Sequence, residues 1–206
     1  MSQRDVWESI AAPWNEYRTT PGSEAAAFLK ERKGFVLDVG CGSGRNFLRG
    51  RYKVVGIDFS LNMLQLAQQT GKKKGISFFG VLSDASVLPF ANDAFDAALS
   101  VAMLHCLRKR ARRKSLEELH RVLKPGAEAL ITVWNREQPR FHGKREGMVP
   151  WTYKGKTYER YYHLYDGGEL ASELAGAGFA VTRLSGSEEK AFNIFPRNII
   201  AVVRKE

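Results

Sequence analysis

The chain has 206 residues, with 32 basic and 22 acidic side chains and a formal net charge of +10. Its hydrophobic fraction of 44% predicts a globular protein with a substantial core. No run approaches the roughly 18 apolar residues of a membrane span, and residues 1–7 lack the apolar segment of a signal peptide. We therefore expect a cytoplasmic protein without a membrane partner, and the excess of basic charge favours a polyanionic partner.

Helix and strand signals alternate from residue 23 onward, which predicts a parallel sheet with helices on both faces. Ser23 and Ser60 are placed to cap two of the helices, and Pro125-Gly126 is placed to end a third. The predicted helices are 23–32, a short one near 45–50, 61–69, 113–123 and 168–176. The predicted strands are 34–39, 53–58, 76–82, 95–101, 127–134, 179–184 and 198–204.

Two segments stand apart from this alternation. Residues 1–22 hold Trp7, Trp14 and Tyr17, and predict a helix followed by an extended arm that lies on the domain. Residues 23–206 then form one domain. Within it, the stretch at about 135–166 looks irregular and carries few apolar runs, and we expect it to be an insertion that binds substrate.

The most informative motif is a glycine-rich turn between two predicted strands. Residues 36–44 read Val-Leu-Asp-Val-Gly-Cys-Gly-Ser-Gly, and Asp58 ends the next strand. Glycine lets a backbone approach a ligand closely, and an acidic residue about 20 positions on commonly binds ribose hydroxyls. A dinucleotide fingerprint needs a third glycine where Arg45 stands. The spacing, with Asp38 in the strand, instead resembles motif I of class I S-adenosylmethionine-dependent methyltransferases; the alternative is a purely structural turn.

This resemblance implies S-adenosylmethionine as cofactor. It also implies a doubly wound, Rossmann-like α/β sheet of seven mostly parallel strands, the last of them antiparallel. Asp38 and its loop would hold the methionine part, Asp58 the ribose and Asp84 the adenine amino group, with 88–90 in apolar contact with the adenine. The cofactor-binding residues predicted in this way are Asp38, Gly40, Cys41, Gly42, Gly44, Asp58, Ser60, Met63, Asp84, Ala85 and Val101.

Residues 100–106, at the end of the fourth predicted strand, would face the transferable methyl group. His105 there either acts as a general base or only shapes the pocket. The four histidines do not pair at metal-ligand spacing, so we expect no metal. Because no base is obvious, a carboxylate is a suitable acceptor, since it is already ionised at pH 7.

Two basic stretches fall on the same side of the predicted sheet. Residues 108–114 carry six cations in seven positions, just before a predicted helix. Residues 136–165 carry seven basic and three acidic side chains, and the aromatic residues interleaved with them are Trp134, Trp151, Tyr153, Tyr158, Tyr161 and Tyr162. Cations interleaved with aromatic rings are typical of a surface that binds RNA phosphates and unstacked bases. The alternative is an ordinary solvated basic face.

Further motifs make the chain similar to the tRNA wobble-uridine carboxymethyl methyltransferases over most of its length. The matching strings are Tyr17-Arg18, His105, Trp134 with Glu137-Gln138, Val149-Pro150-Trp151, Arg160-Tyr161-Tyr162-His163 and Gly168-Glu169-Leu170. The resemblance implies methylation of the carboxyl group of 5-carboxymethyluridine in the tRNA anticodon stem-loop, giving a methyl ester. It further implies that the acceptor pocket is formed or bordered by Arg18, His105, Trp134, Arg160 and Tyr162, with Arg160 or Arg18 holding the carboxylate.

Two positions depart from the family pattern. Gly22 stands where the family has a tryptophan, and Cys106 where it has the second histidine of a pair. The family commonly works with a small zinc-binding activator, which makes such a protein a candidate partner beside tRNA, whereas DNA is not expected. The alternative functions are a small-molecule methyltransferase, for example one acting on a quinone precursor, and a non-catalytic S-adenosylmethionine-binding subunit.

Overall fold

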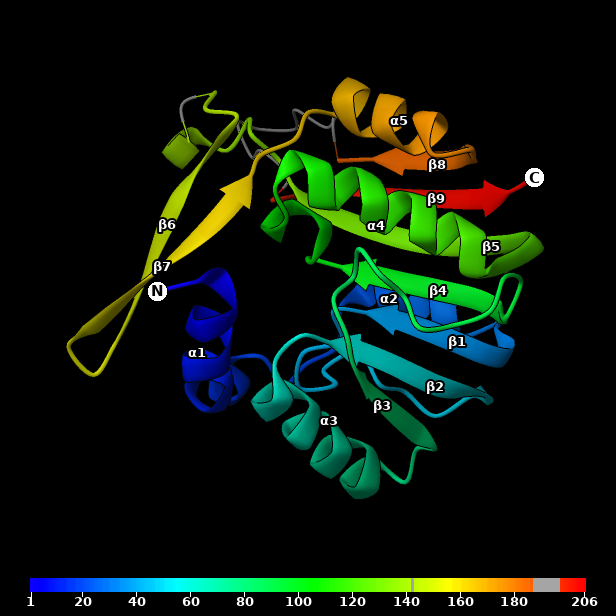
Figure 1. The fold of residues 1–206 in the computed structure, drawn as a ribbon, viewed down its shortest axis with the longest axis horizontal. Coiled ribbons are helices and arrows are strands. Elements are labelled where there is room, and N and C mark those ends of the chain that lie inside the picture. The colour runs from blue at the N-terminus through cyan, green and yellow to red at the C-terminus, as the bar shows by residue number, and fades with distance from the viewer. Residues whose placement is uncertain (142, 187–196) are drawn as a thin grey trace.

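The computed structural model describes residues 1–141, 143–186 and 197–206 (Figure 1). Seven strands form one sheet in the order β3-β2-β1-β4-β5-β9-β8. The pairings among β1 to β5 are parallel, and β9 runs antiparallel to both β5 and β8. The predicted seven-stranded, mostly parallel sheet is thus confirmed. Its strands are β1 (Lys33–Val39), β2 (Arg51–Asp58), β3 (Phe78–Leu82), β4 (Phe95–Val101), β5 (Leu123–Trp134), β8 (Phe179–Ser185) and β9 (Asn198–Lys205).

Helices cover both faces of the sheet, and each face has its own hydrophobic core. These helices are α2 (Ser23–Leu29), α3 (Leu61–Lys74), α4 (Lys109–Val122) and α5 (Gly167–Gly176). α2 and α3 pack in one cluster with Val36 of β1, and α4 and α5 pack in the other with its neighbour Leu37. Successive side chains of a strand point to opposite faces, so β1 serves both cores. In Figure 1, α4 and α5 lie in front of the sheet and α2 behind it.

Several predicted elements differ in the structure. Residues 45–50 form no helix, since turns reach residue 46 and 47–49 have no regular structure before β2 begins. α3 continues to Lys74, because the buried Gly71 has no side chain to obstruct Phe78 of β3. α4 starts at Lys109, so the first basic stretch lies mostly within this helix, and β5 begins before Pro125.

Residues 146–163, expected to be irregular, form a β-hairpin of β6 (Glu146–Tyr153) and β7 (Lys156–His163). Its two turn residues, Lys154 and Gly155, have φ angles of 47° and 78°, as a type I′ turn requires. Exposure alternates along β6, but Pro150 and the polar composition obscure this alternation in the sequence. The Lys-Gly turn is also a weaker hairpin signal than Asn-Gly or Asp-Gly.

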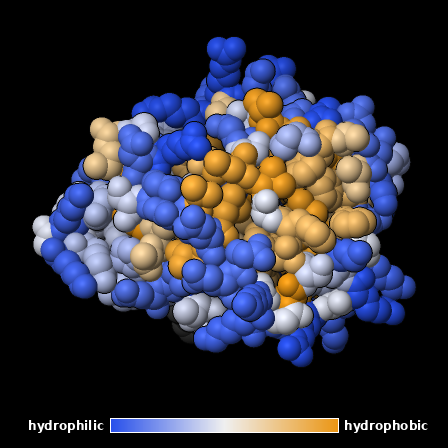
Figure 2. Space-filling view, turned by 60° about the horizontal axis from the view of Figure 1, so that its bottom comes forward, coloured by the Kyte–Doolittle hydropathy of each residue, from blue (hydrophilic) through white to orange (hydrophobic). Residues whose placement is uncertain are grey.

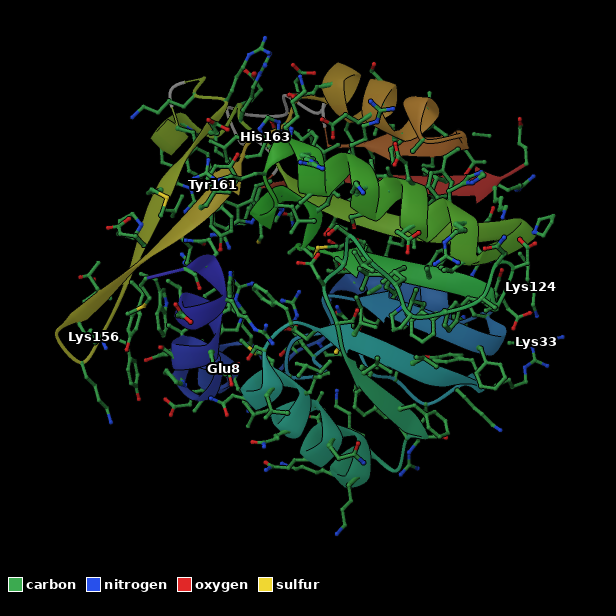
Figure 3. The ribbon with its side chains drawn as sticks, in the orientation of Figure 1. Glu8, Lys33, Lys124, Lys156, Tyr161 and His163 are labelled. Atoms are coloured by element: carbon green, nitrogen blue, oxygen red, sulfur yellow. The ribbon has the colours of Figure 1, made fainter. Side chains whose placement is uncertain are left out.

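Helix α1 (Gln3–Tyr17) connects this hairpin to the sheet (Figures 1 and 3). At one side, the Gln3 side chain accepts a hydrogen bond from the Tyr161 backbone N–H at 2.8 Å. At the other side, Glu8 accepts one from the backbone N–H of Asn62, in α3, at 3.1 Å. α1 therefore spans the edge of the sheet where β1, β2 and β4 end.

Candidate active site

A cavity of about 190 Å³ lies at the carboxyl ends of β1, β2 and β4. Its lining comes from the loop 40–46 after β1, from Asp58 at the end of β2 and from 101–107 after β4. Trp7 and Trp14 of α1 close it on the other side. Open α/β sheets bind their ligands at this edge, so the cavity is where the chemistry is expected.

The loop after β1 turns on glycines that have different tasks. Gly42 has a φ of 53°, and a Cβ there would meet nothing nearer than the Met63 sulfur at 4.0 Å. The backbone at Gly42 is therefore open to a ligand in the cavity. Gly44 has a φ of 78°, but a Cβ would lie 2.6 Å from the Phe47 ring. Gly44 does not line the cavity, so its small size serves packing.

Asp58 fixes this loop to the next strand. One carboxylate oxygen accepts the Gly42 N–H at 2.9 Å, and the other accepts the Ser60 N–H at 2.9 Å. Burial raises the pKa of Asp58 to about 6, although these backbone N–H groups oppose the shift. Each carboxylate oxygen has a second lone pair, so Asp58 can also accept from a ligand diol. Ser60 caps α3 through the Met63 N–H and does not itself line the cavity.

Asp38 lies beneath the loop rather than in the cavity wall. It is 1% exposed, and its Oδ2 atom has no hydrogen-bond partner among the described residues. Burial, with the nearby Asp58 charge, raises the pKa of Asp38 to about 7. A buried carboxylate without a partner is costly, so a cation or donor reaching Oδ2 would stabilise it.

The part of the cavity predicted to hold adenine contains Asp84 and Ala85, but not the apolar residues expected beside them. Asp84 is held by Ser86, whose N–H and hydroxyl both donate to its Oδ1, at 2.8 and 2.6 Å. Leu88 is 4% exposed in the core, and Phe90 packs edge-on against Phe95 at 4.9 Å. Neither lines the cavity, so the expected adenine contact by 88–90 is not seen.

At the opposite end of the cavity, His105 lies against the rings of Trp134 and Tyr162, with ring centroids 5.4 and 5.0 Å away. Its Nδ1 atom accepts the Trp134 backbone N–H at 3.3 Å, which leaves the proton of the neutral ring on Nε2. Burial lowers the pKa of His105 to about 3, with Arg160 and His163 contributing. His105 is therefore a neutral hydrogen-bond donor at pH 7, and its general-base role is not supported.

Arg160 and Tyr162 form a buried pair. An Nη1–H of Arg160 donates to the Tyr162 hydroxyl at 2.7 Å, which leaves the phenol proton available to another acceptor. Burial raises the pKa of Tyr162, so the phenol stays protonated. Arg160 is 4% exposed and lies 5.0 Å from the Trp14 ring centroid, outside the cavity lining. The structure thus places Arg160 behind Tyr162 and outside the cavity wall, whereas the sequence predicted it among the residues that form or border the acceptor pocket.

Arg18 lines this cavity, as does Arg45 of the loop after β1. Arg18 follows α1, and its guanidinium lies 4.8 Å from the Trp14 ring centroid. Burial and the neighbouring charge of Arg45 lower the pKa of Arg18. The cavity wall therefore combines the guanidinium groups of Arg18 and Arg45 with a neutral imidazole and a phenol, all of which can donate to an anionic group.

Residues 36–126 match a family model described as a methyltransferase domain. A putative methyltransferase of Encephalitozoon cuniculi is 35% identical, over 81% of this chain and 80% of its own length. The tRNA (carboxymethyluridine(34)-5-O)-methyltransferase of Schizosaccharomyces pombe is 28% identical, over 85% of this chain and 87% of its own. The chain belongs to this family of class I methyltransferases.

Solved structures agree on the fold of the methyltransferase. A SAM-dependent methyltransferase of Methanosarcina mazei has a TM-score of 0.73 at 20% identity, covering 90% of this chain and 98% of that one. A putative methyltransferase in complex with the Haloferax volcanii Trm112 activator has a TM-score of 0.72 at 20% identity, covering 98% and 97%. Some relatives are longer: the chain spans 32% of the Arabidopsis thaliana enzyme that shares the S. pombe name.

The cofactor of the methyltransferase, S-adenosylmethionine, fits the cavity by the chemistry of its groups. When bound, it supplies an electrophilic methyl group on a sulfonium. Asp38 Oδ2 is a buried acceptor that has no hydrogen-bond partner in the described part of the chain, which suits it to the cofactor's ammonium. Asp58 presents acceptors for a ribose diol and Asp84 an acceptor for an adenine amino group. The lining also includes the predicted Gly40, Cys41, Gly42, Met63, Ala85 and Val101.

Several cavity residues were not predicted as site residues. The clearest are Trp7 and Trp14, which are seven positions apart and therefore lie on one face of α1, two turns apart. This spacing is visible in the sequence and could have identified α1 as a helix that covers the cavity with one aromatic face. Arg45, Asn46 and Met103 also line the cavity, and no local motif marked them.

We predict that Asp38→Asn abolishes cofactor binding and stabilises the ligand-free protein above pH 7. The folded-state pKa lies above the unfolded value of 3.8, so the carboxyl lowers folding stability as the pH rises from about 4 through 7. Asparagine removes this titration. Each 1 kcal/mol gained at pH 8 should raise Tm by about 2–4 °C. Calorimetry of S-adenosylmethionine binding and thermal melting at pH 5 and 8 test both effects.

Asp96→Asn is the matched control, with the opposite sign. Burial opposes the shift, but Lys124 and the Phe35 N–H lower the pKa of Asp96 overall. Its loss should therefore destabilise the protein at pH 8 and leave cofactor affinity unchanged. A Tm of Asp38→Asn at pH 8 equal to or below that of the wild type would show that Asp38 is not strained in the ligand-free fold.

Proposed function

We propose that this methyltransferase esterifies the carboxylate of 5-carboxymethyluridine at the wobble position of tRNA. A carboxylate oxygen would attack the methyl carbon, the carbon–sulfur bond would break, and S-adenosylhomocysteine would leave. The sulfonium and carboxylate charges cancel, so no proton has to be removed. The observation that supports this reaction is an acceptor end whose described residues supply donors and no free base: His105 is neutral, and its Nδ1 atom already accepts a hydrogen bond.

Three side chains would share the acceptor carboxylate. Arg18 lines the cavity and can hold it through a guanidinium fork. The Nε2–H of His105 and the phenol of Tyr162, polarised by Arg160, would orient it toward the methyl group. Positioning of this kind can contribute about 7–11 kcal/mol to lowering a two-reactant barrier. The S. pombe relative, by its name, acts on carboxymethyluridine in tRNA, which favours this acceptor.

The exposed basic residues favour tRNA over a small-molecule acceptor. Lys154 and Lys156 are exposed around the tip of the β6–β7 hairpin, and Arg108, Lys109 and Arg110 are exposed where α4 begins. Fewer residues of the two basic stretches are exposed than the sequence predicted. Arg112 is 3% exposed and pairs with Glu173 at 3.1 Å, so it is not available to RNA.

The aromatic rings of the second basic stretch also serve packing more than predicted. Trp134, Tyr161 and Tyr162 are buried, and Trp151 packs against Trp14 of α1 with ring centroids 5.7 Å apart. Base stacking on all six rings is therefore not supported. The tRNA contact we propose rests mainly on charge.

The test is methyl transfer from labelled S-adenosylmethionine to tRNA that carries unesterified 5-carboxymethyluridine, read by nucleoside mass spectrometry. We expect the methyl ester at the wobble uridine. A product on another nucleoside, or transfer only to small carboxylic acids, would contradict the proposal. Cofactor binding measured in parallel separates a non-catalytic binding subunit from an inactive preparation.

We predict that His105→Asn lowers kcat about 10- to 100-fold without changing the shape of the pH profile between pH 6 and 8. Asparagine can retain an acceptor for the Trp134 N–H but removes the Nε2–H donor, and a hydrogen bond to a charged group is worth about 1.5–3 kcal/mol. If His105 were the base, the wild type would show an ionisation near pH 6.5 that the variant lacks.

We predict that the double variant Lys154→Gln with Lys156→Gln binds tRNA more weakly. The slope of log K against log salt should become shallower by about 1–2, because binding then makes fewer phosphate contacts and releases fewer counterions. The matched control is Lys72→Gln with Lys73→Gln, two exposed lysines at the carboxyl end of α3, remote from the cavity. Equal slopes in both double variants would remove the hairpin from the tRNA contact.

The free edge of the sheet suits the activator expected from the family. β3 ends the sheet, and its Phe79 and Leu82 are 52% and 47% exposed. Figure 2, which brings this side of the molecule forward, shows hydrophobic residues gathered on it. An unpaired strand with apolar side chains is a docking edge for another chain. We propose that a small Trm112-type protein binds at this edge. A structurally similar methyltransferase has been solved in complex with the Haloferax volcanii Trm112 activator, which favours a partner of this kind.

This binding is tested by gel filtration of the methyltransferase with a Trm112-type activator. Phe79→Asp should abolish co-elution, because a charge on the edge repels an apolar partner strand. Met148→Asp changes a similarly exposed residue, 48% exposed on β6, and should leave co-elution intact. Co-elution of both variants would place the activator elsewhere.

A further inference from the structure

A second cavity, of about 220 Å³, adjoins the methyl-transfer cavity. The two share five lining residues, among them Arg18, Arg45 and Trp134. The lining of the second cavity extends from Arg45, in the loop after β1, to the start of β9, where Arg197 and Asn198 line it. The two cavities therefore adjoin at Arg18, Arg45 and Trp134.

Three arginines from distant parts of the chain meet at this second cavity. Arg18 follows α1, Arg45 belongs to the loop after β1, and Arg197 directly precedes β9. Within the part of the chain that the structure describes, no carboxylate forms an ion pair with any of them. Repulsion by Arg45 and Arg197 also contributes to the lowered pKa of Arg18, after burial. Like charges held together in this way are suited to an anion.

The other described polar groups of the cavity do not neutralise this charge. Among the described residues, Glu24 is the one carboxylate in the lining, and it accepts a hydrogen bond from the Ser23 hydroxyl at 2.9 Å. Three guanidinium groups against one carboxylate leave an excess of two positive charges in this described lining. Asn198 has a buried Oδ1 atom without a partner among the described residues. The site therefore offers both cations for an anion and an amide for a neighbouring hydroxyl.

We propose that this cavity binds the phosphate of the nucleotide whose base is methylated, between Arg45 and Arg197. The proposal rests on the proposed function, since Arg18, at the boundary of the two cavities, would hold the carboxylate of the same nucleotide. A phosphate offers more acceptor oxygens than a carboxylate does, so one nucleotide can engage all three guanidinium groups. Asn198 would then face a ribose hydroxyl. The subsite explains why a base-sized acceptor site has more arginines than one carboxylate needs.

The test compares three acceptors: 5-carboxymethyluridine and its 5′- and 3′-monophosphates. We expect one monophosphate to have a kcat/KM at least tenfold above that of the nucleoside with the wild-type protein. Arg197→Gln and Arg45→Gln should each remove most of this advantage. The readout is the kcat/KM of the preferred monophosphate divided by the kcat/KM of the nucleoside, because a general loss of activity lowers both values equally. Arg51→Gln, an exposed residue at the far end of β2, should keep the wild-type ratio.

Two results would overturn the subsite while leaving the proposed function intact: equal kcat/KM for all three acceptors, or a phosphate advantage that persists in both arginine variants. If none of these three small acceptors is methylated, methyl transfer to tRNA decides the proposed function, and ligand binding decides the subsite. Calorimetry with S-adenosylhomocysteine present would compare the uridine monophosphates with uridine. Tighter binding of a monophosphate, lost in Arg197→Gln, supports the subsite, and equal binding overturns it.

Discussion

The carboxylate of Asp58 is the constraint on which the site depends. It accepts one N–H from the loop after β1 and one from the turn that begins α3, so a single side chain fixes two segments at the edge of the sheet. Both bonds are charge-assisted only while the group is ionised, yet burial raises its pKa to about 6. The loop is therefore held by a carboxylate whose ionised form is destabilised by burial. A ligand diol that donates hydrogen bonds to Asp58 would stabilise that ionised form.

The acceptor end of the cavity, unlike the loop held by Asp58, depends on packing between elements that are distant in the sequence. Trp14 of α1 contacts the Trp151 ring of the hairpin, the Arg160 guanidinium and the Arg18 guanidinium. Arg160 in turn fixes the Tyr162 hydroxyl. Trp14 of the first helix therefore contacts Arg18 directly and is linked through Arg160 to the Tyr162 hydroxyl, the two groups proposed to hold the acceptor. A change in how α1 sits would move Arg18 and Tyr162 together.

The sequence predicted what is local and missed what is tertiary. Strand–helix alternation and the glycine motif were sufficient for the sheet, the cofactor loop and Asp58, because backbone conformation and burial pattern determine them over short stretches. The hairpin was missed because Pro150 and polar side chains concealed its alternation. Arg160 was expected to touch substrate, since a string of residues shows its identity but not which side of Tyr162 it occupies. Arg112 was counted as surface charge because its partner, Glu173, is 61 positions away.

The different positions of the arginines relative to the cavity can be related to the charge balance of the proposed reaction. Two opposite charges disappear when a carboxylate is methylated by a sulfonium, so an environment that stabilises the carboxylate strongly would also raise the barrier. The structure keeps the buried Arg160 out of the cavity and lines the acceptor end with neutral donors, His105 and Tyr162, and with aromatic rings. Arg18, which is only half-buried, can hold the anion in place without a fully desolvated ion pair. Arg18 and Arg45 line both cavities and Arg197 lines only the adjoining one, so positive charge is in excess where a phosphate would bind. A phosphate keeps its charge throughout the reaction, and binding it tightly does not oppose methyl transfer.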